Sequence, residues 1–137
     1  MSYTTSVKVR FGDIDLAGVT YYPNLYHYFH IAFEDFFEHY VGTAYPRLLA
    51  EEKLCFPTVK VETQFVRPVK YGDVLEITVT VPRLGSSSAD FVFSAARQGE
   101  DAPCIVSRQT VVAVGMDDFR PMHIPERYRR LFAACAA

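Results

Sequence analysis

The segment from Asn24 to Tyr40 restricts the fold of this chain more than any other, because as a helix it is apolar on nearly every side. One stripe at helical spacing consists of Leu25, Phe29, Ala32, Phe36 and Tyr40. Further apolar side chains widen this stripe and leave only a narrow polar strip, made of His27, His30, Glu34, Asp35 and Glu38. Such a helix is buried on most of its surface, so the sequence predicts a long central helix enclosed by other elements.

Residues at the two ends of this helix indicate where it begins and ends. Pro23 suits the first helical position, where an N–H would have no helical partner. Tyr22 precedes it and is biased toward extended backbone, as an N-cap requires. Gly42 is a typical stop, because glycine readily adopts the left-handed conformation. We therefore expect the helix to begin at Pro23 and to run to about Tyr40, with Tyr22 as its N-cap.

The remaining chain reads mainly as β-strands. A first strand is expected at 3–11 and a short helix at 44–53. Alternating segments rich in Val, Ile and Thr then predict four strands, at 58–69, 73–84, 88–98 and 104–115. Turn residues separate these strands, so we expect them to form a meander. The tail, residues 116–132, ends as a short basic helix.

Together these elements predict one α+β domain, residues 1–137, in which an antiparallel sheet wraps around one long central helix. Half of the residues are hydrophobic and 15% are aromatic, which favours a packed core over disorder. The outer face and the edges of the sheet would stay uncovered, and this favours a homo-oligomer.

Charge, hydropathy and cysteine content indicate which partners and which cellular location to expect. The net charge of −2 argues against nucleic acid, and no apolar stretch approaches the roughly 18 residues that a membrane span needs. The cysteines, Cys55, Cys104 and Cys135, are odd in number and lack metal-type spacing, which is typical of reduced thiols. The first residues carry no apolar signal core. We therefore expect a cytoplasmic protein.

The loop before the helix holds the residues that favour chemistry. Asp13 and Asp15 are one residue apart, so they point in different directions if the backbone is extended. Gly18 permits a sharp turn, and the free amides at the helix start, such as that of Tyr22, can polarise a carbonyl. A nearby carboxylate can attack that carbonyl or activate a water. The alternative is that an aspartate only satisfies the helix amides.

This loop resembles the signature of hot-dog-fold acyl-CoA thioesterases of the 4-hydroxybenzoyl-CoA thioesterase family, Pseudomonas type. The matching residues are Gly12-Asp13-Ile14-Asp15-Leu16-Ala17-Gly18 followed by Tyr21-Tyr22-Pro23-Asn24. The resemblance continues through 66–73 and 83–86, so it covers most of the chain in matching order. It implies a hot-dog fold that forms homodimers or homotetramers with active sites at the dimer interface.

The resemblance also implies roles for single residues. Asp15 matches the catalytic aspartate, a nucleophile or general base, and Asp13 matches its non-catalytic neighbour. Tyr22 matches the position whose amide polarises the thioester carbonyl. The substrate is expected to be an aromatic or medium-sized acyl-CoA, and neither a cofactor nor a metal is expected. The matching substrate-binding positions are Gly18, Pro23, Asn24, Arg67, Arg83, Ser86 and Ser87.

Three alternatives stay open. Only Arg83 stands in the 83–88 stretch, where relatives carry two or three cations for the CoA phosphates, so the chain could act on an acyl-carrier-protein thioester. It could also be a non-catalytic protein that binds acyl thioesters. Family members of a second type place a catalytic carboxylate inside the helix, at Glu34 or Asp35 in this sequence, although a solvated face is the simpler interpretation.

His27, His30 and Glu34 share a helix face, but no fourth metal ligand stands at a recognisable spacing, so we do not expect a metal site there.

Overall fold

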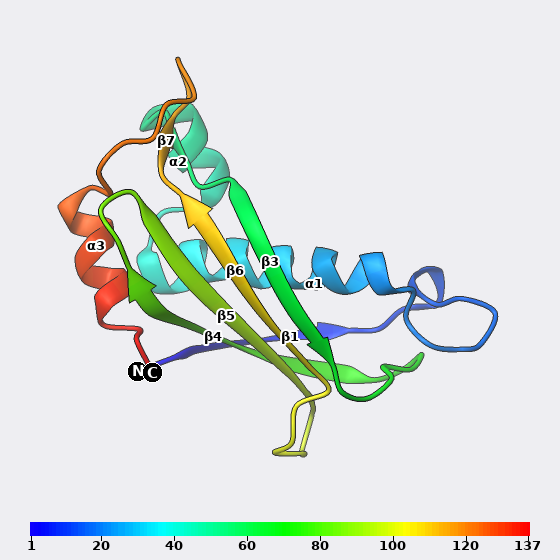
Figure 1. The fold of residues 1–137 in the computed structure, drawn as a ribbon. Coiled ribbons are helices and arrows are strands. Elements are labelled where there is room, and N and C mark those ends of the chain that lie inside the picture. Colours follow the sequence, from blue (N-terminus) through cyan, green and yellow to red (C-terminus); the bar gives the residue numbers. More distant parts are fainter.

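A computed structural model describes all 137 residues, and Figure 1 shows a sheet curved around one long helix, as the sequence predicts. The strands are β1 (Tyr3–Lys8), β2 (Leu54–Cys55), β3 (Thr58–Phe65), β4 (Val74–Leu84), β5 (Ser88–Arg97), β6 (Ile105–Val112) and β7 (Val114–Gly115). The helical elements are the 3₁₀ turn η1 (Phe11–Asp13), α1 (Tyr22–Asp35), the π-helical segment η2 (Phe36–Val41), α2 (Tyr45–Glu51) and α3 (Glu126–Ala133).

The five long strands form an antiparallel sheet in the order β1-β4-β5-β6-β3. The predicted meander is therefore wrong for β3, which pairs with β6 instead of β4. Two features of the 66–73 segment explain the error. The amides of Val66 and Arg67 both bond to the carbonyl of Cys104, and Lys70 forms a bridge with Val19. After β3 the segment thus pairs with the loop that precedes α1, so it does not form a hairpin between β3 and β4.

The long helix lies one residue earlier than predicted at its start. Tyr21 is the N-cap, with extended backbone, and Tyr22 and Pro23 are the first two helical residues. The prediction of Tyr22 as N-cap is therefore wrong by one position, because proline is accommodated at the second position as well as the first. The helix becomes π-helical at Phe36 and stops at Gly42, whose φ of 88° confirms the predicted end.

Aromatic side chains of the helix fill the core beneath the sheet. Phe29, Phe33, Phe36 and Phe37 are buried, and they pack against Phe91 and Phe93 of β5 and against Phe132 of α3. Burying a side chain of this size stabilises a fold by about 2–3 kcal/mol. These contacts explain why the helix is apolar on so many sides.

Two predicted boundaries shift for local reasons. The first strand ends at Lys8, before the predicted Phe11, because the amide of Asp13 turns back to the carbonyl of Arg10 at 3.0 Å. The predicted last strand is divided into β6 and β7, and β7 pairs with β2, an element that the sequence did not indicate. The short helix α2 and the basic helix α3 are confirmed.

Strand β3 forms one of the two edges of the five-stranded sheet. Nearly all its residues are exposed, including Val59, Val61 and Phe65, although they are apolar. An edge of eight residues with exposed apolar side chains can pair with another strand.

None of the helices combines the length and the hydropathy that a membrane-spanning helix requires.

Candidate active site

The loop between η1 and α1 is held in a closed turn. The amide of Gly18 donates to the carbonyl of Asp15 at 3.0 Å, and Ile14 forms a bridge with Thr20. Gly18 has a φ of 78°, a conformation that costs other residues strain. The loop is also fixed to the 66–73 segment, since the amide of Thr20 donates to the carbonyl of Val69 at 2.7 Å. Gly18 therefore shapes the backbone of this loop.

Asp15 lies exposed on the outer side of this turn. Its Oδ1 accepts one hydrogen bond, from the amide of Ala17 at 2.9 Å. No cation of the chain pairs with it. The carboxylate lines an open hollow of about 680 Å³ together with Phe11, Leu16 and Gly18. Most of its acceptor capacity is consequently available to a molecule that enters this hollow.

The amide of Tyr22 is a free donor at the start of α1. In a trans peptide the C=O and the N–H point in opposite directions. The carbonyl of Tyr21 points into the helix, where it accepts from the amide of Asn24 at 2.9 Å. The N–H of Tyr22 belongs to the same peptide unit, so it points out of the helix end, and it has no acceptor within the chain. The positive end of the helix dipole lies at the same place.

A second hollow, of about 220 Å³, lies beside Tyr22. Its walls are mainly apolar and come from the loop, from the start of α1 and from the 65–69 segment: Val19, Thr20, Tyr22, Leu25, Phe65, Val66, Arg67, Pro68 and Val69. Arg67 is the one cation in this wall, and it also approaches Glu100 at 3.6 Å. The apolar lining residues Leu25, Phe65 and Val66 were not singled out from the sequence, because they look like ordinary strand and helix positions.

Asp13 and Asn24 hold the loop against the helix. The side-chain amide of Asn24 donates to the backbone carbonyl of Asp13 at 2.9 Å. The Asp13 carboxylate accepts from the amide of Arg10 at 3.1 Å and from the hydroxyl of Tyr28 at 2.6 Å. Asp13 therefore lies in the turn, and the Asn24 side chain is engaged in a hydrogen bond within the chain.

The remaining predicted substrate contacts lie at the other end of the sheet. Arg83, Ser86 and Ser87 sit at the turn between β4 and β5, far along the sheet from the loop that carries Asp15 (Figure 1). The Nη2 of Arg83 donates to Asp90 and Ser88 at 2.9 and 3.0 Å. The hydroxyl of Ser86 lies 3.2 Å from His123 Nδ1. One chain alone does not bring these residues to Asp15 and Tyr22.

Two carboxylates of the helix's polar strip, Glu34 and Asp35, have partners within the chain. Glu34 lies 2.8 Å from His30, and the Asp35 carboxylate accepts from the hydroxyl of Thr5 at 2.8 Å. Pairing of Glu34 with His30 agrees with the interpretation of a solvated face. His27 instead lines the cavity that also holds Asp13 and Tyr28, apart from His30 and Glu34. Asp35, Glu38 and His39 lie close enough to share an ion, but Glu38 and His39 are exposed.

The two halves of this arrangement have complementary chemistry. An unpaired amide at a helix N-terminus stabilises negative charge on a carbonyl oxygen. An ionised carboxylate with free lone pairs supplies a nucleophile or a general base. The Asp15 carboxylate and the Tyr22 amide lie within eight residues of sequence. Between them, Gly18 lines the hollow that holds Asp15, and Val19 lines the hollow beside Tyr22. Such a pair suits hydrolysis at an activated carbonyl.

Comparison with known proteins shows what the chain is similar to. Residues 9–132 match the family model described as the thioesterase-like superfamily. The chain is 30% identical to a 1,4-dihydroxy-2-naphthoyl-CoA hydrolase of Thermosynechococcus vestitus over 74% of the chain and 68% of that protein. Relatives of the same name from Synechococcus sp. and Nostoc punctiforme are 37% and 30% identical, over 59% and 68% of this chain and over 57% and 62% of their own lengths.

Solved structures share the fold over almost the whole chain. A thioesterase-superfamily protein from Jannaschia superposes with a TM-score of 0.91 and 24% identity, covering 99% of this chain and 94% of that one. A gentisyl-coenzyme A thioesterase superposes with a TM-score of 0.83 and 25% identity, covering 93% and 99%. The fold predicted from the sequence is confirmed by these superpositions.

Proposed function

The chain belongs to the thioesterase-like superfamily, and we propose that it hydrolyses an aromatic acyl-CoA to the free acid and CoA, at a site built from Asp15 and the Tyr22 amide. Its enzyme class is thioester hydrolase, which is the class of its named relatives. The resemblance to the Pseudomonas-type 4-hydroxybenzoyl-CoA thioesterases therefore holds at the level of the superfamily. The relatives named for their substrates act on dihydroxynaphthoyl-CoA and gentisyl-CoA.

The observation that carries the proposal is the unpaired Tyr22 amide, which points out of the N-terminus of α1. In the proposed mechanism the thioester carbonyl accepts from this amide, so its carbon becomes more electrophilic. Asp15 then attacks that carbon or removes a proton from a water that attacks it. If Asp15 attacks, the carbon–sulfur bond breaks to leave a mixed anhydride on Asp15, and a water then hydrolyses this anhydride to the acid and the free carboxylate. If Asp15 acts as the base, the water adds directly and the carbon–sulfur bond breaks to give the acid. In both cases the thiolate of CoA takes up the proton that the water loses.

An aromatic acyl group is favoured by the hollow beside Tyr22. Leu25, Phe65 and Val66 give it apolar walls, and the aromatic rings of Phe65 and Tyr22 suit contact with a planar ring. Dihydroxynaphthoyl, gentisyl and 4-hydroxybenzoyl groups share this chemistry. We propose that the acyl group lies against these walls while its carbonyl meets the Tyr22 amide.

We further propose that the complete site needs a second copy of the chain. Arg83, Ser86 and Ser87 lie at the opposite end of the sheet from Asp15, and β3 is an exposed edge along one side of the sheet. Two copies that pair β3 edges antiparallel would place the β4–β5 turn of one beside the loop of the other. The substrate phosphates would then meet cations of both copies.

A panel of thioesters tests this function. Free thiol would be measured with dihydroxynaphthoyl-CoA, gentisyl-CoA, 4-hydroxybenzoyl-CoA, a saturated medium-chain acyl-CoA and an acyl-carrier-protein thioester. We expect the largest kcat/KM among the three aromatic CoA esters. Preference for the carrier-protein thioester would replace the CoA assignment, and binding of every thioester without turnover would indicate a non-catalytic protein.

A further inference from the structure

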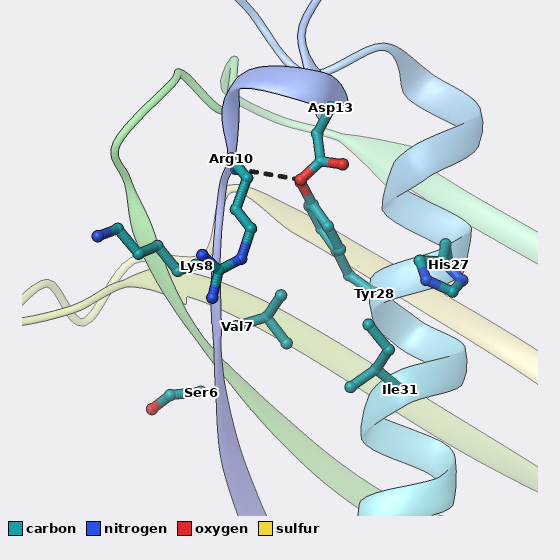
Figure 2. Close-up of a pocket in the computed structure, with 8 residues that line it drawn as sticks. All are labelled: Ser6, Val7, Lys8, Arg10, Asp13, His27, Tyr28 and Ile31. Carbon is teal, nitrogen blue, oxygen red and sulfur yellow. Dashed lines mark hydrogen bonds between the residues drawn. The ribbon is translucent and has the colours of Figure 1, made fainter.

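A partly buried hydrogen bond joins the loop to Tyr28 in the first half of α1. Tyr28 is only 3% exposed, and its hydroxyl donates to the Asp13 carboxylate at 2.6 Å. Figure 2 shows the Tyr28 ring rising from the helix to meet Asp13, beside a cavity of about 350 Å³ between β1 and α1. This cavity shares no lining residue with the hollow beside Tyr22, and Tyr28 does not line that hollow.

Asp13 connects this bond to both parts of the proposed site. Its backbone carbonyl accepts from the amide of Tyr21 at 3.0 Å, and Tyr21 supplies the other half of the peptide unit that carries the Tyr22 N–H. Along the chain Asp13 stands two residues before Asp15. A shift of Asp13 therefore moves the carboxylate of Asp15 and tilts the N–H of Tyr22 together.

The Tyr28 hydroxyl is a permanent donor in this position. Burial, the hydrogen bond to Asp13 and the negative charge of that carboxylate all raise the pKa of Tyr28 above its usual value of 10. The hydroxyl consequently stays protonated throughout the physiological range. The ring itself packs in the core, so loss of the hydroxyl alone leaves most of its apolar contacts in place.

We infer that Tyr28 and Asp13 are positioning residues for the thioesterase reaction, because their hydrogen bond fixes the loop that carries Asp15 against the helix end that carries the Tyr22 amide. This inference rests on the proposed function. Neither side chain lines the hollow proposed for the acyl group. They act by aligning the Asp15 carboxylate and the Tyr22 amide on one carbonyl. A displacement of about 1 Å in such an alignment can lower the rate about 100-fold.

The test compares Tyr28→Phe with Tyr40→Phe. Tyr40 is a matched control, because its hydroxyl also donates a hydrogen bond, to the carbonyl of Leu131 at 2.8 Å, at the far end of the helical segment. We expect Tyr28→Phe to lower kcat at least tenfold with KM changed less than threefold, while Tyr40→Phe keeps kcat within twofold. Asp13→Ala should lower kcat similarly, and the double variant should be no worse than the poorer single variant.

Hydrogen exchange of backbone amides provides a readout that needs no turnover. In Tyr28→Phe the amides of Asp13 and Tyr21 should exchange at least tenfold faster than in the wild type, and they should be unchanged in Tyr40→Phe. Equal exchange and equal kcat in the two variants would overturn the inference. If the wild-type protein turned over no thioester, the proposed function would fail, and the exchange rates would still decide whether the bond fixes the loop.

Discussion

The amide of Asp15 donates a 2.9 Å hydrogen bond to the carbonyl of Val19, and this bond closes the loop that carries the proposed catalytic carboxylate. The closure needs a reversal of the chain between the two residues. Gly18 supplies it with a φ of 78°. The position of Asp15 thus depends on a backbone conformation that favours glycine.

We predict that Gly18→Ala lowers both stability and activity. A methyl group at this position meets no neighbour within 4 Å, so the cost comes from the backbone, about 1–2 kcal/mol in the free energy of unfolding. If the loop relaxes to a negative φ instead, Asp15 moves and kcat falls, by roughly tenfold. Chemical denaturation and thiol release measure the two effects.

Gly12→Ala is the matched control for this prediction. Gly12 stands in the same loop region, has equally open surroundings and does not have a positive φ. It should retain the stability and the kcat of the wild type. Equal behaviour of the two alanine variants would contradict the role assigned to Gly18.

The division of the site between two copies predicts complementation. Asp15→Asn disables the loop, and Ser86→Trp fills the space at the β4–β5 turn, so each variant alone should be inactive. In a mixed dimer one of the two sites combines an intact Asp15 with an intact turn. Equal mixing with exchange of subunits should therefore restore about a quarter of wild-type activity by symmetry.

Thiol release from the mixture measures this complementation, and light scattering gives the molar mass and so the oligomeric state. A mixture as inactive as its two components would show that both elements act within one chain. A monomeric wild-type protein that turns over the substrate would contradict the shared site equally.

A cluster around Asp90 on the outer face of the sheet predicts a pH-dependent stability. Arg83, Arg108 and Thr110 donate to the Asp90 carboxylate at 2.8–3.0 Å. These donors, Arg83 foremost, hold the pKa of Asp90 well below its ordinary value of 3.8. A lowered pKa in the folded state means that the stabilisation is present above pH 3.8 and is lost as the pH falls below it.

We therefore expect Asp90→Asn to lower the free energy of unfolding by about 2 kcal/mol at pH 7, because charged hydrogen bonds of Asp90 are lost. The difference from the wild type should shrink as the pH is lowered from about 4 toward 2. Denaturation curves at several pH values measure it, with the exposed Asp101→Asn as control. A difference that does not change with pH would contradict an origin in the charge of Asp90.

The sequence predicted the parts of the fold that depend on local patterns. The central helix could be recognised because its apolar residues repeat at helical spacing over four turns, and its stop could be placed at Gly42 because glycine adopts a positive φ there. The start was misplaced by one residue, since Pro23 is tolerated at either of the first two helical positions.

The arrangement of the sheet depends on contacts that are distant in sequence. The turn residues after β3 look like a hairpin, yet Thr63 of β3 pairs with Ser107 of β6, and the two hydroxyls lie 2.9 Å apart. No local pattern in β3 reveals this partner. The hydrogen bond between Tyr28 and Asp13 was missed for the same reason, because an aromatic residue on an apolar helix reads as core.

The candidate site could be proposed from the sequence only where a motif is continuous. Asp15, Gly18 and Tyr22 stand within eight residues of one another, and the structure brings them into one loop and helix start. Arg83, near the end of β4, and Ser86, in the turn after it, lie at the far end of the sheet, and the sequence alone does not show how far that is from Asp15.

The role of Asp15 is tested most directly by thiol release from the best aromatic acyl-CoA with Asp15→Asn. Asparagine keeps the shape and can still accept from the amide of Ala17, so the loop should stay intact while the charge is lost. Asp101→Asn, on an exposed hairpin, is the control. We predict that Asp15→Asn retains the wild-type melting temperature and loses at least ~100-fold in kcat. A kcat within about threefold of the wild type would contradict the assignment of Asp15 to the chemical step.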